Sequence, residues 1–356
     1  MATIELDQQK LEAFGESIVG LVANSFVGLG LSVGHRTGLF DTLAKLPPAT
    51  SEQVARAAGL NERYVREWLA VMTTGGITEY NATDRTYRLP AEHAAFTTRA
   101  AGPNNVAAFA VFISMMGDVE SDVVDCFTNG GGVPYSRYGR FQELMKAESA
   151  VVFDNALIPN ILPLAPGLTD RLRAGIEVAD IGCGSGRAIN VLAREFPNSR
   201  FTGYDFSPDG IAEGRREASD WGLTNASFEE ADAAKLDIAN RFDLITAFDA
   251  IHDQAQPRKV LANIARALKP DGTFLMADIA GSSNLEDNLG NPMATMFYAV
   301  SLFHCMTVSL ALDGEGLGTM WGEQKARELL AEAGFTTVAV TQVEGDIQNN
   351  YYIATK

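Results

Sequence analysis

A run of apolar residues that ends in an acid and leads into alternating glycines constrains this chain most strongly. The segment Val178–Gly186 carries Asp180 just before its turn. Its three glycines are Gly182, Gly184 and Gly186. A strand that runs directly into such a turn is typical of a parallel α/β sheet, because glycine has no Cβ and lets a ligand lie against the main chain. The dinucleotide-binding pattern G-x-G-x-x-G would need glycine where this chain has Arg187, so the G-x-G-x-G spacing does not match it.

Two acids that follow the next strands indicate a ligand that contains a nucleoside. Arg200–Tyr204 has the composition of a strand and is followed by Asp205 and Phe206. An acid at this place suits paired hydrogen bonds to ribose hydroxyls. After another expected helix and strand come Asp232 and Ala233, where the carboxylate can accept a hydrogen bond from an adenine amino group.

A fourth strand, Phe242–Phe248, completes a series of separated motifs. Their order resembles that of the class I S-adenosylmethionine-dependent methyltransferases over about residues 170–356. The resemblance implies a Rossmann-like, seven-stranded α/β domain with S-adenosyl-L-methionine as cofactor. It assigns cofactor contacts to Asp180, Gly182, Gly184, Gly186, Asp205, Phe206, Asp232, Ala233, Phe248 and Asp249. A dinucleotide-dependent dehydrogenase, or a related fold that binds no ligand, is the alternative.

The rest of this half of the chain continues to alternate between helix and strand. The expected elements are a helix at Arg258–Leu268, a turn at Lys269–Gly272, a strand at Thr273–Ala277, a helix at Gly322–Ala333, and an antiparallel pair formed by Val338–Val340 and Tyr352–Ala354. Such alternation predicts a mostly parallel sheet that is covered on both faces. We therefore assign residues 171–356 to the methyltransferase domain.

Residues 1–100 form a different, mainly helical module. Helices are expected at Ser51–Ala58, capped by Ser51 or Thr50, and at Glu62–Thr74, capped by Asn61. The segments 75–80 and 86–89 then predict a small β-hairpin. Helix, turn, helix and hairpin together make a winged helix-turn-helix, which raises transcription regulation as a competing function.

The charge of this module argues against DNA binding. The chain has 28 basic and 45 acidic side chains, and residues 1–100 have nine and eleven, a net of −2. A DNA-binding face is expected to be clearly basic. The second expected helix offers only Arg63 and Arg66, against Glu62 and Glu67. Nucleic acid is therefore not an expected partner.

A homodimer is the expected assembly. Small-molecule O-methyltransferases, which this arrangement resembles, use a similar winged helix to build a dimer and to roof the neighbour's active site. The leading helix fits that role, because it carries an apolar face that one domain does not readily bury alone. That face consists of Ile18, Leu21, Val22, Phe26 and Leu29.

Composition favours a cytoplasmic enzyme. The formal net charge is −17, and we expect neither an apolar run of membrane-spanning length nor a basic, apolar leader. The cysteines Cys126, Cys183 and Cys305 are too few and too scattered for a disulfide framework or a zinc site, so no metal is expected.

Residues 101–170 are expected to connect the two modules through helices and a segment rich in glycine and tyrosine. The segment Asn129–Gly139 contains three consecutive glycines together with Tyr135 and Tyr138. Because aromatic faces and phenol oxygens attract a sulfonium cation, we expect both tyrosines to border the methionine end of the cofactor. A surface loop packed by its own tyrosines is the alternative.

His252 is the candidate general base. It follows the fourth strand, and ligands of open α/β sheets bind at the carboxyl ends of strands. His252-Asp253 matches a His-Asp pair of the winged-helix O-methyltransferases, although Gln254 stands where that family commonly has tryptophan. An imidazole suits removal of a hydroxyl or thiol proton. Asp278, at the end of the next strand, is expected to orient His252.

A long insertion at about 280–320 is the candidate substrate cap. It is rich in methionine and aromatic residues, which make adaptable walls for a flat aromatic or fatty acceptor. The pocket residues expected here are Met293, Met296, Phe297 and His304. An apolar helix that covers the core or a dimer seam is the alternative. The expected acceptor is a small, largely apolar molecule that carries a hydroxyl, while N-, S- and C-methylation stay open.

Overall fold

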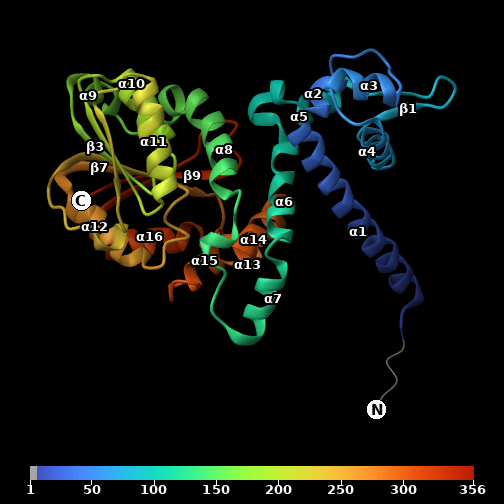
Figure 1. Ribbon diagram of the computed structural model, residues 1–356. Helices are drawn as coiled ribbons and strands as arrows, with labels where there is room; N and C mark the ends of the chain where they lie inside the picture. Colours follow the sequence, from blue (N-terminus) through green and yellow to red (C-terminus); the bar gives the residue numbers. More distant parts are fainter. Residues whose placement is uncertain (1–5) are drawn as a thin grey trace. The chain divides into compact units, whose positions relative to one another are not determined.

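The computed structural model describes residues 6–356, and the chain divides into two compact units that meet in sequence at Gly117 and Asp118 (Figure 1). The connector expected at residues 101–170 is therefore shared between the two units. Every residue of the candidate active site belongs to the second unit.

The first unit is built on a long helix, α1 (Gln8–Thr37), which begins at the N-cap Asp7 and ends at Gly38 in the left-handed conformation. A stripe of small residues near its end lets other helices approach closely. The indole of Trp68 donates a hydrogen bond to the Gly30 carbonyl oxygen at 2.7 Å. A Cβ on Gly34 would lie 2.5 Å from the rings of Phe40 and Trp68, so only glycine fits there.

The apolar residues of α1 are exposed within this unit. Leu21, Val22 and Phe26 are between 55% and 63% exposed. Our expectation of no apolar segment of spanning length is wrong, because an 18-residue window of α1 has a mean hydropathy of 1.7 and is only 17% buried. This finding rests on the length and composition of one helix near the N-terminus. Signal sequences and the core helices of soluble proteins meet the same criteria.

The winged helix-turn-helix forms as expected. Helix α3 (Ser51–Ala58) begins with a capping box in which Thr50 and Gln53 bond reciprocally, and α4 (Glu62–Thr74) is capped by Asn61. The wing is shorter than predicted, with β1 (Glu79–Asn81) paired to β2 (Thr86–Arg88). The remaining elements are α2 (Leu39–Leu43), α5 (Ala91–Thr97), two 3₁₀ turns (Arg99–Asn104 and Val106–Ala108) and α6 (Ala110–Gly117).

The second unit contains a seven-stranded sheet with the order β5-β4-β3-β6-β7-β9-β8. The strands are β3 (Glu177–Ile181), β4 (Arg200–Asp205), β5 (Ala226–Glu230), β6 (Phe242–Phe248), β7 (Leu268–Ile279), β8 (Thr337–Thr341) and β9 (Asn349–Thr355). The first five strands of the sheet are parallel, and β9 is antiparallel to both neighbours. This confirms the predicted fold class, including the closing antiparallel pair. The strand order reverses between β4 and β6, at β3, which is where open α/β sheets bind ligands.

Helices cover both faces of this sheet (Figure 1). One face packs against α9 (Leu168–Ala174), α10 (Arg187–Glu195) and α11 (Pro208–Asp220), and the other against α12 (Pro257–Ala267) and α16 (Gly322–Glu332). Leu192 on the first face and Leu330 on the second are fully buried, so each face of the sheet has its own hydrophobic core. Burial on both faces explains why the central strand β6 has four consecutive buried residues, Leu244–Ala247, rather than an alternating pattern.

The predicted turn at Lys269–Gly272 is instead part of β7. The pairing register passes from Phe242 opposite Leu268 to Leu244 opposite Thr273, so these residues bulge out of the strand rather than end it. The bulge leaves the register beyond Thr273 regular up to Ala277 opposite Phe248.

The second unit also contains the connector and cap helices. Before the sheet come α7 (Glu120–Asn129), a 3₁₀ turn (Tyr135–Arg137), α8 (Phe141–Asn155), a π-helical turn (Leu157–Ile161) and a 3₁₀ turn (Leu162–Leu164). A further 3₁₀ turn spans Ala233–Lys235. The cap consists of α13 (Leu285–Asn288), α14 (Ala294–Val300), a π-helical turn (Ser301–Cys305) and α15 (Met306–Leu310).

Candidate active site

The glycine-rich turn lies between β3 and α10. All three glycines have positive φ, and two are fixed by packing: a Cβ on Gly182 would lie 2.5 Å from that of Ala250, and one on Gly186 would overlap the ring of Phe228. Gly184 differs, because a Cβ there would meet nothing within 4 Å. The middle of the turn therefore presents bare backbone to open space, as a loop that cradles a ligand requires.

Asp205, at the end of β4, ties this turn to the neighbouring strand. Its carboxylate accepts hydrogen bonds from the Gly184 and Ser207 amides, each at 2.8 Å. Burial raises the pKa of Asp205, while these amides act in the opposite direction. A carboxylate has about four acceptor positions, so these two amides and that of Phe206 leave room for a ribose hydroxyl. The predicted cofactor fits this arrangement.

Asp180 holds in place the strand that leads into this turn. It is buried at the end of β3, and it accepts a hydrogen bond from the Thr246 hydroxyl at 2.7 Å. Burial raises the pKa of Asp180 to about 7, with the Thr246 hydroxyl opposing the shift. Because β3 and β6 are paired at Asp180 and Thr246, this contact fixes the two central strands relative to each other.

The predicted adenosine contacts occupy neighbouring strand ends. Asp232 caps the Ala233–Lys235 turn by accepting from the Ala234 amide at 2.9 Å, and it also pairs with Lys235. Phe206 is 47% exposed, so its ring is available to a ligand. Phe248 is partly buried and packs against Phe153 of α8, with 5.0 Å between ring centroids.

Asp249, directly after β6, is a strained and partly unsatisfied acid. It has a φ of 49°, which is uncommon for a residue other than glycine. One of its oxygens accepts from the Asn349 amide at 3.4 Å, and the other has no hydrogen-bond partner in the described chain. Burial and then the Asp278 charge raise the pKa of Asp249 to about 7.

His252 and Asp278 form a buried pair at the carboxyl ends of β6 and β7. His252 Nδ1 lies 2.8 Å from Asp278 Oδ1. The same oxygen accepts from the Ile279 amide and from the indole of Trp321, both at 2.9 Å. Because a carboxylate only accepts, Nδ1 carries the proton and Nε2 keeps the lone pair in the neutral imidazole. Burial, the largest single effect, lowers the pKa of His252, but the charge and hydrogen bond of Asp278 together with those of Cys305 raise that pKa well above its usual value.

Asp253, the residue after His252, forms a hydrogen bond with a tyrosine. The Tyr135 hydroxyl donates a hydrogen bond to the Asp253 carboxylate. Burial raises the pKa of Asp253 to about 6. The ring of Tyr135 lies against Phe206, at 5.2 Å between centroids. The glycine- and tyrosine-rich segment thus joins the His252 side of the site to Phe206, and the Tyr135–Asp253 bond is a feature that sequence reasoning missed.

His304 sits in the π-helical turn of the cap, surrounded by aromatic rings. Phe141 of α8 stacks on it at 4.1 Å between centroids, and Tyr138 and Tyr135 approach at 4.7 and 5.4 Å. The Tyr138 hydroxyl donates to the Phe303 carbonyl oxygen at 2.5 Å. Tyr138 thus contacts the cap, whereas the ring of Tyr135 contacts both His304 and Phe206.

The other predicted pocket residues gather elsewhere in the cap. Phe297 is 3% exposed and belongs to a small cluster with Ile279 and Met320, against which Met293 and Met296 pack. Packing beside Ile279, the residue after Asp278, fits both a pocket wall and an apolar helix over the core, so the pocket role of these residues stays a prediction.

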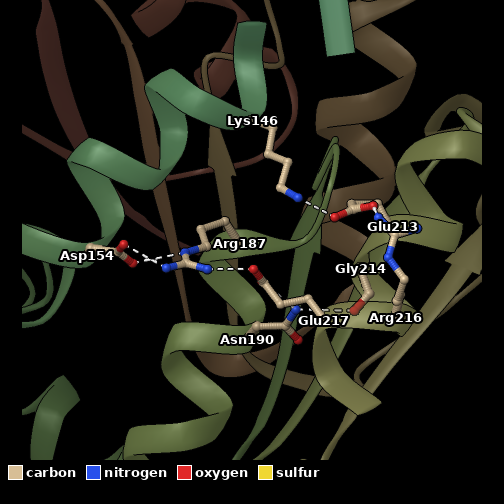
Figure 2. Close-up of polar contacts among 8 residues, drawn as sticks. All are labelled: Lys146, Asp154, Arg187, Asn190, Glu213, Gly214, Arg216 and Glu217. Atoms are coloured by element: carbon tan, nitrogen blue, oxygen red, sulfur yellow. Dashed lines mark hydrogen bonds and ion pairs between the residues drawn. The ribbon is translucent and has the colours of Figure 1, made fainter. Parts of the chain in front are cut away.

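Arg187 fixes α8 against the helices that follow the glycine-rich turn (Figure 2). Its guanidinium binds both oxygens of Asp154 on α8, at 2.9 and 2.6 Å, and reaches Glu217 on α11 at 2.5 Å. Asn190 also donates to Glu217, at 2.9 Å. Lys146 of α8 pairs with Glu213 of α11 in the same view. Because Arg187 directly follows Gly186, this network connects α8, which carries Phe141 and Phe153, to the cofactor turn.

Two family models match this chain. One, described as an Rv2258c-like winged HTH domain, matches residues 25–99. The other, described as a methyltransferase domain, matches residues 172–344. The winged helix-turn-helix and the methyltransferase domain predicted from the sequence are thereby confirmed.

Sequence relatives align with about a third of the chain. The chain is 31% identical over 121 residues to a trans-aconitate 2-methyltransferase of Methylobacterium nodulans, which is 34% of this chain and 42% of the relative. It is 34% identical over 105 residues to a fatty-acid O-methyltransferase of Mycolicibacterium smegmatis, 29% of this chain and 37% of the relative. The chain thus spans about two fifths of these curated relatives.

Solved structures resemble the chain over its whole length. The mitomycin 7-O-methyltransferase MmcR has a TM-score of 0.72 at 19% identity, over 98% of this chain and 100% of that one. Human N-acetylserotonin methyltransferase, solved in complex with SAM, has a TM-score of 0.67 at 19% identity, over 100% and 99%. At this identity the likeness establishes the fold.

The Arg187 network should contribute measurably to stability. Replacing Arg187 with Gln leaves Asp154 and Glu217, which are 38% and 14% exposed, without their cation. We expect the free energy of unfolding in urea to fall by about 1–2 kcal/mol, between the values for surface and buried pairs. Arg173→Gln is the control, because its pair with Asp170 is 64% and 86% exposed. Equal losses in both variants would contradict the role given to Arg187.

Proposed function

We propose that this chain, which carries an S-adenosylmethionine-dependent methyltransferase domain preceded in sequence by a winged helix-turn-helix domain, methylates a hydroxyl group of a small, uncharged acceptor. His252 acts as the general base and Asp278 as its orienting partner. The observation that carries the proposal is the 2.8 Å contact between His252 and Asp278 at the sheet edge where the glycine-rich turn also lies.

The proposed reaction begins with proton removal by His252. With Nδ1 bonded to Asp278, the lone pair of Nε2 accepts the acceptor's hydroxyl proton as the oxygen attacks. The Asp278 charge stabilises the imidazolium that results, and Trp321 and the Ile279 amide hold that carboxylate in place. When bound, S-adenosylmethionine supplies the electrophilic methyl group. The rest of the protein's work is alignment and exclusion of water.

Cofactor binding in this proposal rests on the strand ends. The Asp205 carboxylate accepts hydrogen bonds from the ribose hydroxyls, and the backbone of Gly184 faces the cofactor. Asp232 lies near the adenine ring. Tyr135 and Phe206 supply aromatic surface between Asp205 and Asp253, which suits a sulfonium cation.

A hydroxyl acceptor fits this site better than a carboxylate. Two sequence relatives are named for the methylation of acids, trans-aconitate and fatty acids. A carboxylate is already ionised at neutral pH and needs no base, so a His–Asp pair brings it no advantage. The charged groups with the largest effects on Asp253 are His252, Asp278 and Asp205.

The winged helix is proposed to build a homodimer through α1. Its exposed apolar residues form a surface that monomeric proteins rarely leave uncovered. Both arginines of α4 already pair with acids on the same helix, Arg63 with Glu67 and Arg66 with Glu62, which supports a structural role over DNA binding.

The first test is calorimetric titration with S-adenosylhomocysteine, with NAD as the control ligand. We expect micromolar binding of S-adenosylhomocysteine and no binding of NAD, because Arg187 stands where the dinucleotide pattern has its third glycine. His252→Ala should keep this affinity and lose methyl transfer to hydroxylated acceptors by about 10²–10⁴-fold. Asp205→Ala should weaken cofactor binding first.

Two results would count against this function. Binding of NAD alone would support a dehydrogenase. Binding of S-adenosylhomocysteine without methyl transfer to a broad acceptor panel would leave a binding-only protein.

The dimer is tested by sedimentation equilibrium. The wild-type chain should sediment as a dimer, and Phe26→Glu should shift it toward monomer, because Phe26 is 63% exposed within its own unit. Tyr64→Glu is the control, since Tyr64 is 79% exposed on α4, outside the proposed surface. A wild-type monomer would exclude the dimer.

A further inference from the structure

We infer that His304 is a second hydrogen-bonding partner of the methyl acceptor, so that the acceptor is a flat ring compound with a second hydroxyl beside the one that is methylated. This inference rests on the proposed function and adds to it the chemical class of the acceptor. His304 is then a specificity-determining residue, separate from the base His252.

The first observation is an unsatisfied nitrogen. His304 is 2% exposed, yet its Nε2 has no hydrogen-bond partner in the described chain. Its other nitrogen, Nδ1, lies 3.6 Å from Cys305 Sγ. A buried polar atom without a partner costs about 1–3 kcal/mol, and native proteins seldom keep one without a reason. A ligand that bonds Nε2 removes this cost.

The second observation is that His304 cannot serve as a charged group. Burial lowers its pKa to about 3, and the nearby charge of His252 acts in the same direction. The imidazole therefore stays neutral at physiological pH and does not attract a carboxylate. It offers one hydrogen bond to an uncharged group.

The third observation is where this nitrogen is held. His304 lies in a π-helical turn inserted between α14 and α15, and such turns are frequent at functional sites. The next residue in that turn, Cys305, acts on the pKa of His252, so the two imidazoles belong to one neighbourhood. The stacked ring of Phe141 and the edges of Tyr135 and Tyr138 surround the imidazole with the aromatic surface that a flat ligand requires.

A hydroxyl is the group that fits Nε2 in either tautomer. If the Cys305 thiol donates to Nδ1, Nε2 carries the proton and donates; otherwise Nε2 accepts. A hydroxyl both donates and accepts, whereas an ether or carbonyl oxygen only accepts. Because His252 takes the proton of one hydroxyl, the arrangement favours a ring that carries two neighbouring hydroxyls.

The test compares two probes that differ by one hydroxyl. Protein saturated with S-adenosylhomocysteine is titrated with 2,3-dihydroxynaphthalene and with 2-naphthol, and the two Kd values are measured. Wild-type protein should bind the diol about tenfold more tightly, as expected for one neutral hydrogen bond. His304→Phe keeps a ring of similar shape and should bring the two Kd values close together. His304→Gln, whose amide can reach the same point, should recover part of the preference.

Tyr298→Phe is the matched control. It removes a hydroxyl on the same cap, where Tyr298 accepts a hydrogen bond from Asn288 at 3.1 Å, and it should leave the preference unchanged. Thermal unfolding of each variant confirms that it folds.

The outcomes separate this inference from the function on which it rests. Binding of S-adenosylhomocysteine with equal Kd values for both naphthols in wild-type protein overturns the role of His304 and leaves methyl transfer standing. A preference for the diol that survives in both His304→Phe and His304→Gln also overturns it. Failure to bind S-adenosylhomocysteine overturns both proposals.

Discussion

The contact between His252 and Asp278 is the interaction on which the account of this site depends. It joins the ends of β6 and β7, whose register is fixed up to the pair Phe248 and Ala277. Asp278 is fully buried, and its Oδ1 accepts three hydrogen bonds, from His252, Trp321 and the Ile279 amide. Such donors compensate a buried carboxylate for its lost solvation, and in Asp278 all of them bind Oδ1, while Oδ2 has no partner in the described chain. These hydrogen bonds therefore fix the ends of β6 and β7, the imidazole of His252 and the indole of Trp321, at the start of α16, relative to one another.

Much of this could be predicted from the sequence, because it depends on local patterns. The apolar strands and the glycine-rich turn indicate a parallel sheet, and the structure has that sheet with the expected closing antiparallel pair. Cap residues such as Asn61 mark helix starts through short-range hydrogen bonds, so helix bounds follow from few residues. Asp278 was also identifiable, since equivalent ends of adjacent parallel strands lie side by side.

What the sequence could not indicate are contacts between distant segments. Asp253 follows His252 and looks like its partner, yet it bonds Tyr135, which is 118 residues away in sequence. The cap shows the same limit. Met293, Met296 and Phe297 have the composition of a pocket and pack around Ile279 and Met320, and composition alone does not separate a pocket wall from a helix that covers the core. His304 is set apart from them by its π-helical turn, its aromatic neighbours and its unpaired Nε2, none of which has a clear sequence signature.

The most direct measurement of the central claim is a titration of the four histidines by NMR, with ¹⁵N in their imidazole rings. In wild-type protein, His252 should titrate above the usual histidine pKa, because the Asp278 charge and Cys305 stabilise the imidazolium. Methyl transfer should rise with pH through that same pKa, because only the neutral imidazole can accept the hydroxyl proton. Asp278→Asn removes that charge and should lower the pKa of His252, since burial then dominates. His304 should remain neutral from pH 5 to 8 in both proteins. A His252 that titrates at or below the usual value in wild-type protein, or that does not respond to Asp278→Asn, would contradict the proposed base.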